Sequence, residues 1–496
     1  MHHAKLTLDP AFKVAPVHRR TFGTFVEHLG RCVYTGIYEP GHPTADEDGF
    51  RRDVLDLTRE LGVSTVRYPG GNFVSGYRWE DGVGPVAERP RRLDLAWHST
   101  ETNEVGVDEF VRWCRRAGVE PMMAVNLGTR GIAEALDLLE YCNHPSGTAL
   151  SDQRIANGAK EPHGIRMWCL GNELDGPWQT GHKTAREYGR LAAETARAMR
   201  MVDPGLELVA CGSSSSSMPT FGSWEAEVLE ETYDLVDHIS CHAYYQEKDG
   251  DLGSFLACST DMDYFIASVV ATADHVGARL KSRKKINISF DEWNVWYQSR
   301  FHDTGTPEGW PVAPPLLEDQ YHLADAVAFG GLLISLLRNS DRVTAASLAQ
   351  LVNVIAPIMT EPGGRAWRQT TFHPFAQASR YAAGDVLRVE PVAPAYETKA
   401  YGEVPLMDAV ATHDGESTTL FAVNRSADTP ISLEIDARAL GGVRIVEATT
   451  LTDPDVYARN TADDPGRIAP RPNPDVEHDP ARVLLPPVSW NVIRLG

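Results

Sequence analysis

The sequence predicts a (β/α)₈ TIM barrel with a C-terminal, jelly-roll-like antiparallel β-sandwich, and three observations lead to this fold class. Residues 18–383 alternate short β-rich runs with amphipathic stretches, as α/β proteins do. Polar side chains stand at the ends of most of these runs. After residue 383 the chain changes to short alternating runs separated by Gly, Asp and Pro, as in all-β domains.

Each β-rich run is interpreted as one strand, and the runs lie at residues 21–27, 64–69, 120–128, 166–173, 206–213, 237–245, 286–292 and 344–352. Between them, apolar residues recur at the three- and four-residue spacing of helices, as in 50–62, 107–118, 131–142 and 184–202. The first two of these stretches end at Gly62 and Gly118, which we expect to be C′ glycines. Residues 143–164 are polar, and we expect a loop there.

Alternating strands and helices also occur in doubly wound sheets, and the polar residues decide between the two folds. A barrel brings all strand C-termini to one rim, whereas an open sheet separates those of its edge strands. The polar residues end seven of the eight runs, and we expect them at one rim: Glu27, Asn72, Asn126, Asn172, Glu173, His242, Tyr244, Glu292 and Gln350.

The domain boundaries follow from the change of pattern. We expect a catalytic barrel over residues 18–383 and a β-sandwich over residues 384–496. Residues 1–17 contain the strand-like run AKLTLDPAF, which precedes the first barrel strand, and we expect it to pair into the sandwich.

Composition limits the functional classes. A net charge of −21 on 496 residues argues against nucleic acid or an anionic membrane as a partner, because both would repel the protein. The N-terminal run MHHAKLTLDPAFKV lacks the apolar segment of a signal peptide. The seven cysteines form no CxxC pair and suit reduced thiols. We therefore expect a cytoplasmic protein.

Glu173 and Glu292 follow apolar runs, where burial of a carboxylate is costly. A single glutamate in this position often does no more than interact with the dipole of the next helix. Two of them, each flanked by aromatic residues, suit glycoside hydrolysis, which uses one carboxyl group as acid and the other as nucleophile or base. Aromatic rings stack on sugars, and they flank both sites: Trp168, Trp178, Trp293, Trp296 and Tyr297.

Other motifs carry less weight, and none predicts a metal or cofactor. The glycines of RYPGGN do not match a phosphate-binding loop, and no GxSxG motif of serine hydrolases occurs. His238 and His242 have a spacing that binds zinc on a helix, but on a strand they lie roughly 13 Å apart. His242 faces the same rim as Tyr244, where it either supports the site or simply packs.

Several segments carry a resemblance to a known family. The runs WCLGNELDGPW and DEWNVWY, together with FGTFVEHLGRCVYTGIYEPGHP and VRYPGGNFVSGYRWEDGVGP, resemble the α-L-arabinofuranosidases of glycoside hydrolase family 51. The similarity continues through YCNHPSGTALSDQRIANG, SCHAYY and PPVSWNVIRLG, and so covers nearly the whole chain. It implies a retaining, exo-acting enzyme without a cofactor, which removes arabinofuranose from arabinan- or arabinoxylan-derived oligosaccharides, and a homo-hexamer.

The resemblance also implies roles for individual residues. Glu173 would be the acid/base and Glu292 the nucleophile, oriented by Tyr244. The other residues that it implies at the sugar are Glu27, Asn72, Asn172 and Gln350, with Trp97 and Trp296 as aromatic walls toward the leaving group. His242 joins these candidates through its position two residues before Tyr244. Two alternatives stay open: an endo-β-glucanase or β-xylosidase on the same barrel, and a non-catalytic carbohydrate-binding protein.

Overall fold

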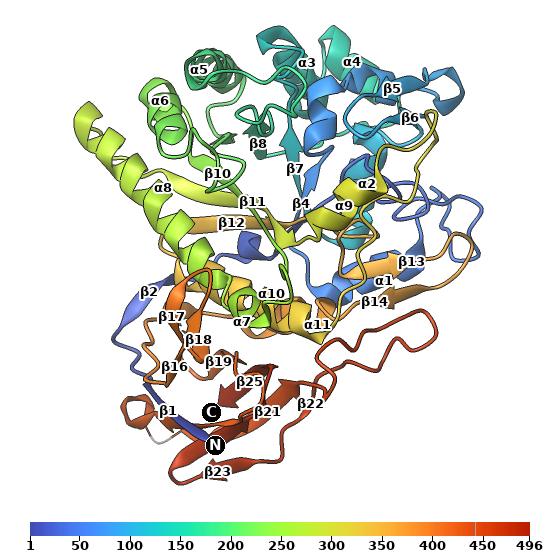
Figure 1. Ribbon diagram of the computed structural model, residues 1–496. Helices are drawn as coiled ribbons and strands as arrows, with labels where there is room; N and C mark the ends of the chain where they lie inside the picture. Colours follow the sequence, from blue (N-terminus) through green and yellow to red (C-terminus); the bar gives the residue numbers. More distant parts are fainter. Residues whose placement is uncertain (442) are drawn as a thin grey trace.

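The computed structural model describes residues 1–441 and 443–496, and its centre is a closed barrel of eight parallel strands (Figure 1). Every predicted run overlaps one of them, so the predicted barrel is confirmed. Pairing of Ser347 with Gly23 closes the barrel between the last strand and the first. In chain order the strands are β3 (Gly23–Phe25), β4 (Thr65–Tyr68), β7 (Glu120–Ala124), β8 (Met167–Leu170), β9 (Glu207–Ala210), β10 (His238–Tyr245), β11 (Asn287–Val295) and β12 (Val343–Leu348).

A helix follows each barrel strand. The first seven of these helices lead to the next strand, and the eighth follows the last strand. These helices are α1 (Arg52–Leu61), α2 (Val107–Ala117), α3 (Ile132–Asn143), α5 (Ala185–Val202), α6 (Ser223–Thr232), α8 (Ser259–Leu280), α10 (Leu323–Arg338) and α11 (Phe372–Tyr381). The predicted glycine caps are confirmed, because α1 and α2 end at Gly62 and Gly118 with left-handed φ values of 78° and 77°.

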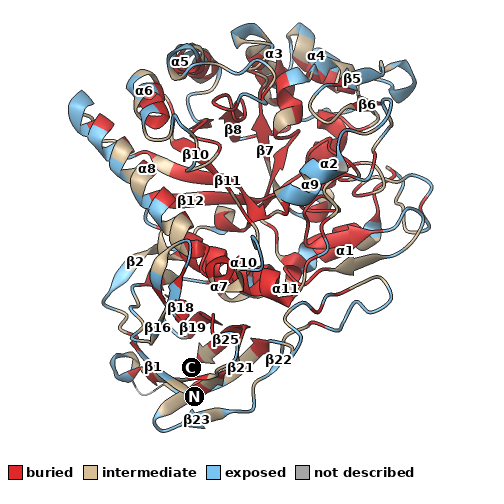
Figure 2. Cartoon of the chain, in the orientation of Figure 1, coloured by how far each residue is buried: buried red, intermediate tan, exposed pale blue. Residues whose placement is uncertain are grey.

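Helix α10 lies between the barrel and the C-terminal sheets, and it is buried on all sides (Figure 2). It contacts β11 and β12 of the barrel and also β18 (Met407–His413), β19 (Thr418–Asn424) and β25 (Ser489–Leu495). Its sequence LADAVAFGGLLISLLR is apolar around the whole helix, as a helix covered on both sides requires. A Cβ at Gly330 would come within 2.4 Å of the Trp490 ring, so the glycine allows the close approach.

The C-terminal strands form two main sheets with an apolar core between them. The larger sheet has the order β2-β15-β18-β19-β25-β21-β22, and the smaller has the order β1-β20-β24-β23. Strands not yet bounded are β1 (His2–Thr7), β2 (Lys13–Pro16), β15 (Asp385–Leu387), β20 (Ile431–Asp436), β21 (Ile445–Leu451), β22 (Arg471–Pro472), β23 (Val476–His478) and β24 (Ala481–Leu485). The remaining hairpins are β5 (Arg92–Asp94) with β6 (Ser99–Glu101), β13 (Ile358–Thr360) with β14 (Ala366–Arg368), and β16 (Ala395–Thr398) with β17 (Gly402–Pro405).

The N-terminal strands pair with this C-terminal part of the chain. β1 lies next to β20, with His2 opposite Ile431, and β2 lies next to β15. The β1–β20 pair is parallel, however, so the sheets are not antiparallel throughout as the sequence pattern predicts. The chain returns through the whole barrel between these two strands, and such a long connection permits a parallel pair.

Two local predictions are wrong. The expected loop at residues 143–164 contains helix α4 (Ala149–Ala156), which begins where the Thr148 hydroxyl accepts a hydrogen bond from the Ser151 N–H. The helix is short and polar, so hydrophobic spacing does not reveal it. The strand expected to end at Glu292 also continues to Val295, so Glu292 lies within β11.

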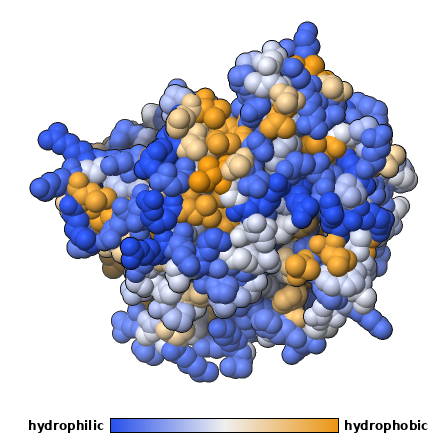
Figure 3. Space-filling view, turned by 90° about the horizontal axis from the view of Figure 1, so that it is seen from above, coloured by the Kyte–Doolittle hydropathy of each residue, from blue (hydrophilic) through white to orange (hydrophobic). Residues whose placement is uncertain are grey.

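The surface fits the acidic composition. On the face shown in Figure 3 hydrophilic side chains predominate, and apolar ones gather in separate patches. Across the described part of the chain, no helix combines the length and the apolar character needed to cross a membrane.

Candidate active site

Glu173 and Glu292 come together inside the barrel mouth, as the sequence predicts for a carboxylate pair. One oxygen of each carboxylate and one nitrogen of His242 lie within 4.8 Å of one another. Both glutamates are buried, with 8% and 5% of their surfaces exposed. Two buried carboxyl groups this close repel each other when both are ionised.

Glu173 follows β8 on a strained backbone. Its φ of 43° is uncommon for a residue other than glycine and costs about 1–3 kcal/mol, which functional sites often tolerate. The Trp178 indole N–H donates to Oε2 at 2.7 Å, and the His242 Nδ1 lies 2.8 Å from Oε1. Both carboxylate oxygens are therefore held, one from its own loop and one from β10.

Glu292 is held from two other strands. The Arg67 guanidinium of β4 donates to Oε1 at 2.8 Å, and the Tyr244 hydroxyl of β10 donates to Oε2 at 2.8 Å. Burial raises the pKa of Glu292; His242 and Arg67 oppose that rise, while Glu173 adds to it. The carboxylate thus has a fixed orientation in a site that water reaches poorly.

His242 lies between three carboxyl groups. Its Nδ1 faces Glu173, and its Nε2 lies 2.9 Å from Asp291 Oδ1. Burial opposes the charge of this imidazole, but Glu292, Asp291 and Glu173 outweigh burial and hold its pKa well above the usual range. The raised pKa favours the imidazolium form of His242, which can donate from both nitrogens to its carboxylate neighbours.

Arg67 is the main residue of the site that sequence reasoning missed. Besides Glu292, its guanidinium donates to Asn172 Oδ1 at 2.7 Å and lies 3.8 Å from Asp291. Its pKa is well above the usual value, because the attraction of Asp291 and Glu292 exceeds the effect of burial. The available signal was a charged residue in the middle of the strand run STVRYP.

Replacement of Arg67 by methionine should reduce the free energy of unfolding by about 3–5 kcal/mol, because it removes the buried guanidinium that faces Asp291 and Glu292 and leaves His242 to compensate both carboxylates. Denaturant unfolding, monitored by tryptophan fluorescence, measures this effect. Arg197→Met is the control, because Arg197 is 53% exposed and its pair with Glu194 contributes little. If Arg67→Met lowered the free energy of unfolding no more than Arg197→Met does, Arg67 would not be the buried cation that stabilises these carboxylates.

Glu27 forms a second acidic position beside the pair. Oε1 accepts from the Phe73 N–H and the Trp97 indole, both at 2.9 Å, and Oε2 accepts from the Gln350 amide at 3.0 Å. The adjacent glycines of RYPGGN leave room for this carboxyl group. A Cβ at Gly70 would come within 2.7 Å of Glu27 Cγ, and one at Gly71 within 2.8 Å of Glu27 Oε2, so these glycines serve close packing.

The stability of the protein should depend on pH through Glu27. Burial raises the pKa of Glu27 to about 8, against the effect of the Phe73 hydrogen bond, so the folded state favours the protonated form. Stability should therefore fall as pH rises from the usual glutamate value toward 8, because only the unfolded chain ionises in that range. Glu27→Gln should remove this dependence, which thermal unfolding at several pH values would show. Equal pH profiles for the variant and the wild type would contradict the assignment.

The remaining predicted residues line the same mouth. The Asn172 amide approaches Asn72 Oδ1 at 3.4 Å, which brings the loops after β8 and β4 together. The Trp296 ring packs edge-on against the Tyr244 ring, with 5.0 Å between ring centroids. The Phe301 ring contacts both tryptophans, with its centroid 5.9 Å from that of Trp296 and 6.3 Å from that of Trp97. Aromatic side chains thus flank the carboxylates on the side of the loops after β4 and β11.

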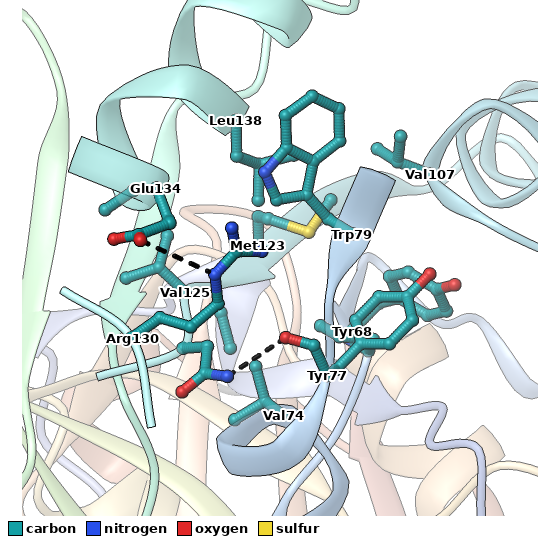
Figure 4. A pocket seen from close by; sticks show the side chains of 14 residues that line it. Tyr68, Val74, Tyr77, Trp79, Val107, Met123, Val125, Arg130, Glu134 and Leu138 are labelled. Carbon is teal, nitrogen blue, oxygen red and sulfur yellow. Dashed lines mark hydrogen bonds and ion pairs between the residues drawn. The ribbon is translucent and has the colours of Figure 1, made fainter. Parts of the chain in front are cut away.

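Two residues singled out in the sequence lie elsewhere. Asn126 holds the turn after β7, where its Oδ1 accepts from the N–H groups of Gly128 and Thr129. It borders a cavity of about 20 Å³ between the barrel wall and α3, which has room for about one water molecule and none for a sugar (Figure 4). His238 bonds to Thr344 at the opposite end of β10 from Tyr244.

Among the described residues, one group of three side chains has its possible metal-ligand atoms close enough together to hold an ion, and it consists of Glu173, His242 and Glu292. Both nitrogens of His242 lie within hydrogen-bond distance of carboxylate oxygens, Nδ1 of Glu173 and Nε2 of Asp291. His242 thus joins this group to Asp291 by hydrogen bonds.

Comparison with known proteins gives the family. Residues 57–261 match the profile of the α-L-arabinofuranosidase 1 domain, and residues 291–489 match that of the α-L-arabinofuranosidase C-terminal domain. An intracellular exo-α-(1→5)-L-arabinofuranosidase of Streptomyces lividans is 63% identical over all of this chain and 75% of its own length. An exo-α-(1→6)-L-arabinofuranosidase of Bifidobacterium longum is 58% identical over all of this chain and 98% of its own length.

Solved structures agree. A family 51 α-L-arabinofuranosidase from Bifidobacterium longum has a TM-score of 0.97 and 51% identity, covering 100% of this chain and 99% of that one. A family 44 endoglucanase from Clostridium thermocellum, at 12% identity and a TM-score of 0.60, shares only the fold. With the carboxylate pair in the barrel mouth, these matches show that the chain is a glycoside hydrolase and belongs to the α-L-arabinofuranosidases of family 51.

Proposed function

We propose that this protein is a retaining, exo-acting α-L-arabinofuranosidase that releases terminal L-arabinofuranose from oligosaccharides derived from arabinan or arabinoxylan. The observation that carries the retaining mechanism is the distance within the pair, where oxygens of Glu173 and Glu292 lie within 4.8 Å. Retaining enzymes hold their carboxyl groups about 5–5.5 Å apart, whereas inverting enzymes need about 6.5–9.5 Å to admit a water molecule.

The contacts of the two glutamates support different roles. Glu292, oriented by Tyr244 and Arg67, attacks the anomeric carbon, and the bond to the leaving oxygen breaks as Glu173 donates a proton. Water then attacks the glycosyl-enzyme while Glu173 takes its proton, and arabinose leaves. During the cycle the negative charge passes from the carboxylate of Glu292 to that of Glu173. His242 lies between the two carboxyl groups and compensates this charge in both positions.

The polar residues around the pair suit an arabinofuranose ring. Asn172 binds the sugar hydroxyl next to the anomeric carbon, and its orientation is fixed by Arg67. Glu27, Asn72 and Gln350 bind further hydroxyls. Trp97 and Trp296 form the walls toward the leaving group.

The discriminating experiment is a substrate comparison. We expect hydrolysis of p-nitrophenyl α-L-arabinofuranoside and of short arabino-oligosaccharides, with little release from p-nitrophenyl β-xyloside and none from cellulose. The relatives named above act on (1→5) and (1→6) linkages by name, so both should be offered. Preference for the xyloside or cellulose would favour the β-xylosidase or endoglucanase alternative, and no hydrolysis at all would favour a binding protein.

The cellular location and assembly are also proposals. Several relatives carry the word intracellular in their names, which supports action inside the cell on imported oligosaccharides. The homo-hexamer rests on the family resemblance alone, and the charge of −21 opposes association. Light scattering at micromolar concentration should give the mass of six chains of 54.6 kDa, and a single-chain mass would exclude the hexamer.

A further inference from the structure

A cavity of about 370 Å³ lies beside the carboxylate pair, between the barrel and the hairpin β16–β17 of the C-terminal part. Its size falls within the roughly 300–1,000 Å³ of small-molecule sites. Its walls come from residues 244–258 at and after the end of β10, from Gln298 after β11, and from residues 399–401 at the tip of the hairpin. We refer to it as the hairpin groove.

The hairpin groove shares strand β10 with the residues that hold the carboxylate pair. Strand β10 contacts both catalytic carboxylates, because His242 bonds to Glu173 and Tyr244 bonds to Glu292. Tyr244 is also one of the residues that line the groove. Gln298 lies two residues after Trp296, whose ring packs on Tyr244. Tyr244 therefore links the groove to the carboxylate of Glu292.

Two hydrogen bonds hold the hairpin tip in place. The Tyr396 hydroxyl donates to the Gly253 carbonyl at 2.7 Å, and the Ala400 N–H donates to Ser254 Oγ at 3.2 Å. Gly253 and Ser254 belong to the short helix α7 (Leu252–Leu256), which follows β10. Lys399 and Tyr401 are thus fixed over the groove, although they come from the C-terminal part of the chain.

The groove has the surface chemistry of a neutral carbohydrate site. Its side chains include two amides, Gln246 and Gln298, which donate and accept as sugar hydroxyls require. The Tyr401 and Phe255 rings offer apolar faces. Lys248 and Lys399 are balanced by Asp249 and Asp251, so the groove has no excess charge that would select an ionic ligand.

We propose that the hairpin groove binds the released part of the substrate, the sugars beyond the scissile bond, and that Lys399 and Tyr401 make the enzyme prefer oligosaccharides over single glycosides. This inference rests on the proposed function, because it concerns the leaving group of that reaction. It assigns to the C-terminal part of the chain a direct contact with substrate.

The test compares kcat/KM for linear arabinotetraose with kcat/KM for p-nitrophenyl α-L-arabinofuranoside, whose leaving group is too short to fill the groove. In the double variant Lys399→Ala, Tyr401→Ala, this ratio should fall about tenfold, as loss of two contacts of ordinary strength predicts. The fall should lie mainly in KM, since Lys399 and Tyr401 take no part in bond breaking and would bind substrate and transition state alike. Glu403→Ala is the matched control, because Glu403 is exposed on the same hairpin and outside the groove.

An unchanged ratio in the double variant would overturn the proposal, and so would an equal loss on both substrates, which would mean that the change acts through the fold. Tyr401→Phe with Lys399→Gln gives a second, milder pair if the double alanine variant unfolds, and it should lower the same ratio by a smaller factor. A wild-type enzyme that released no arabinose from the aryl glycoside would instead show that the proposed function itself is wrong.

Discussion

Glu292→Ala is expected to lower kcat/KM by on the order of 10⁵-fold or more on every substrate, including those with good leaving groups. Without this carboxylate no glycosyl-enzyme can form, and the Tyr244 hydroxyl and the Arg67 guanidinium lose their shared acceptor. Added azide can enter the vacated space and attack from the side opposite the leaving group. It should therefore give the arabinosyl azide of inverted configuration, which proton NMR identifies.

The matched control for this variant is Glu227→Ala, because Glu227 is an exposed glutamate on α6 and should tolerate the change. A Glu292→Ala enzyme that kept more than about a hundredth of wild-type activity would place the nucleophile elsewhere. Retained azide product would instead assign the acid/base role to Glu292.

Glu173→Ala is expected to lower activity on natural oligosaccharides by about 10²–10⁴-fold, the usual value of general acid–base assistance. Dinitrophenyl arabinofuranoside needs little protonation, so its glycosyl-enzyme should form rapidly and then accumulate without a base. Azide needs no base and should restore turnover. Because Glu292 is intact, two displacements occur and the azide product should retain the α configuration.

Three measurements check this variant: the burst of dinitrophenol, the rate with azide, and the configuration of the product. Inverted azide product from Glu173→Ala together with retained product from Glu292→Ala would reverse the two assignments. Wild-type rates in both variants would place the active site outside the barrel mouth.

The barrel and most of the candidate site could be predicted, because periodicity and strand ends are local properties of a sequence. Parallel strands in a closed barrel deliver their C-terminal ends to one rim, so Asn172, Tyr244 and Gln350 converge on the same mouth as the two glutamates. Asn126 meets the same criterion and nevertheless only holds a turn. The end of a strand therefore predicts the neighbourhood of a side chain rather than its role.

The charges that bind the site together could not be predicted in the same way. Arg67 lies in the middle of a strand run, and its partners Asp291 and Glu292 are more than two hundred residues away in the chain. Which buried cation meets which buried carboxylate depends on strand order and register, which no local pattern encodes. The extension of β11 beyond Glu292 and the parallel β1–β20 pair depend on neighbouring strands in the same way.

The pairing of β1 with β20 has a consequence for how the molecule is made. His2 emerges from the ribosome early, but its partner Ile431 follows more than four hundred residues later, which corresponds to on the order of tens of seconds of synthesis. β25, an interior strand of the larger sheet, follows all the other strands of both sheets in the chain. The strand β1 therefore waits unpaired while all eight barrel strands are synthesised, and the larger sheet is completed only after β25 has followed.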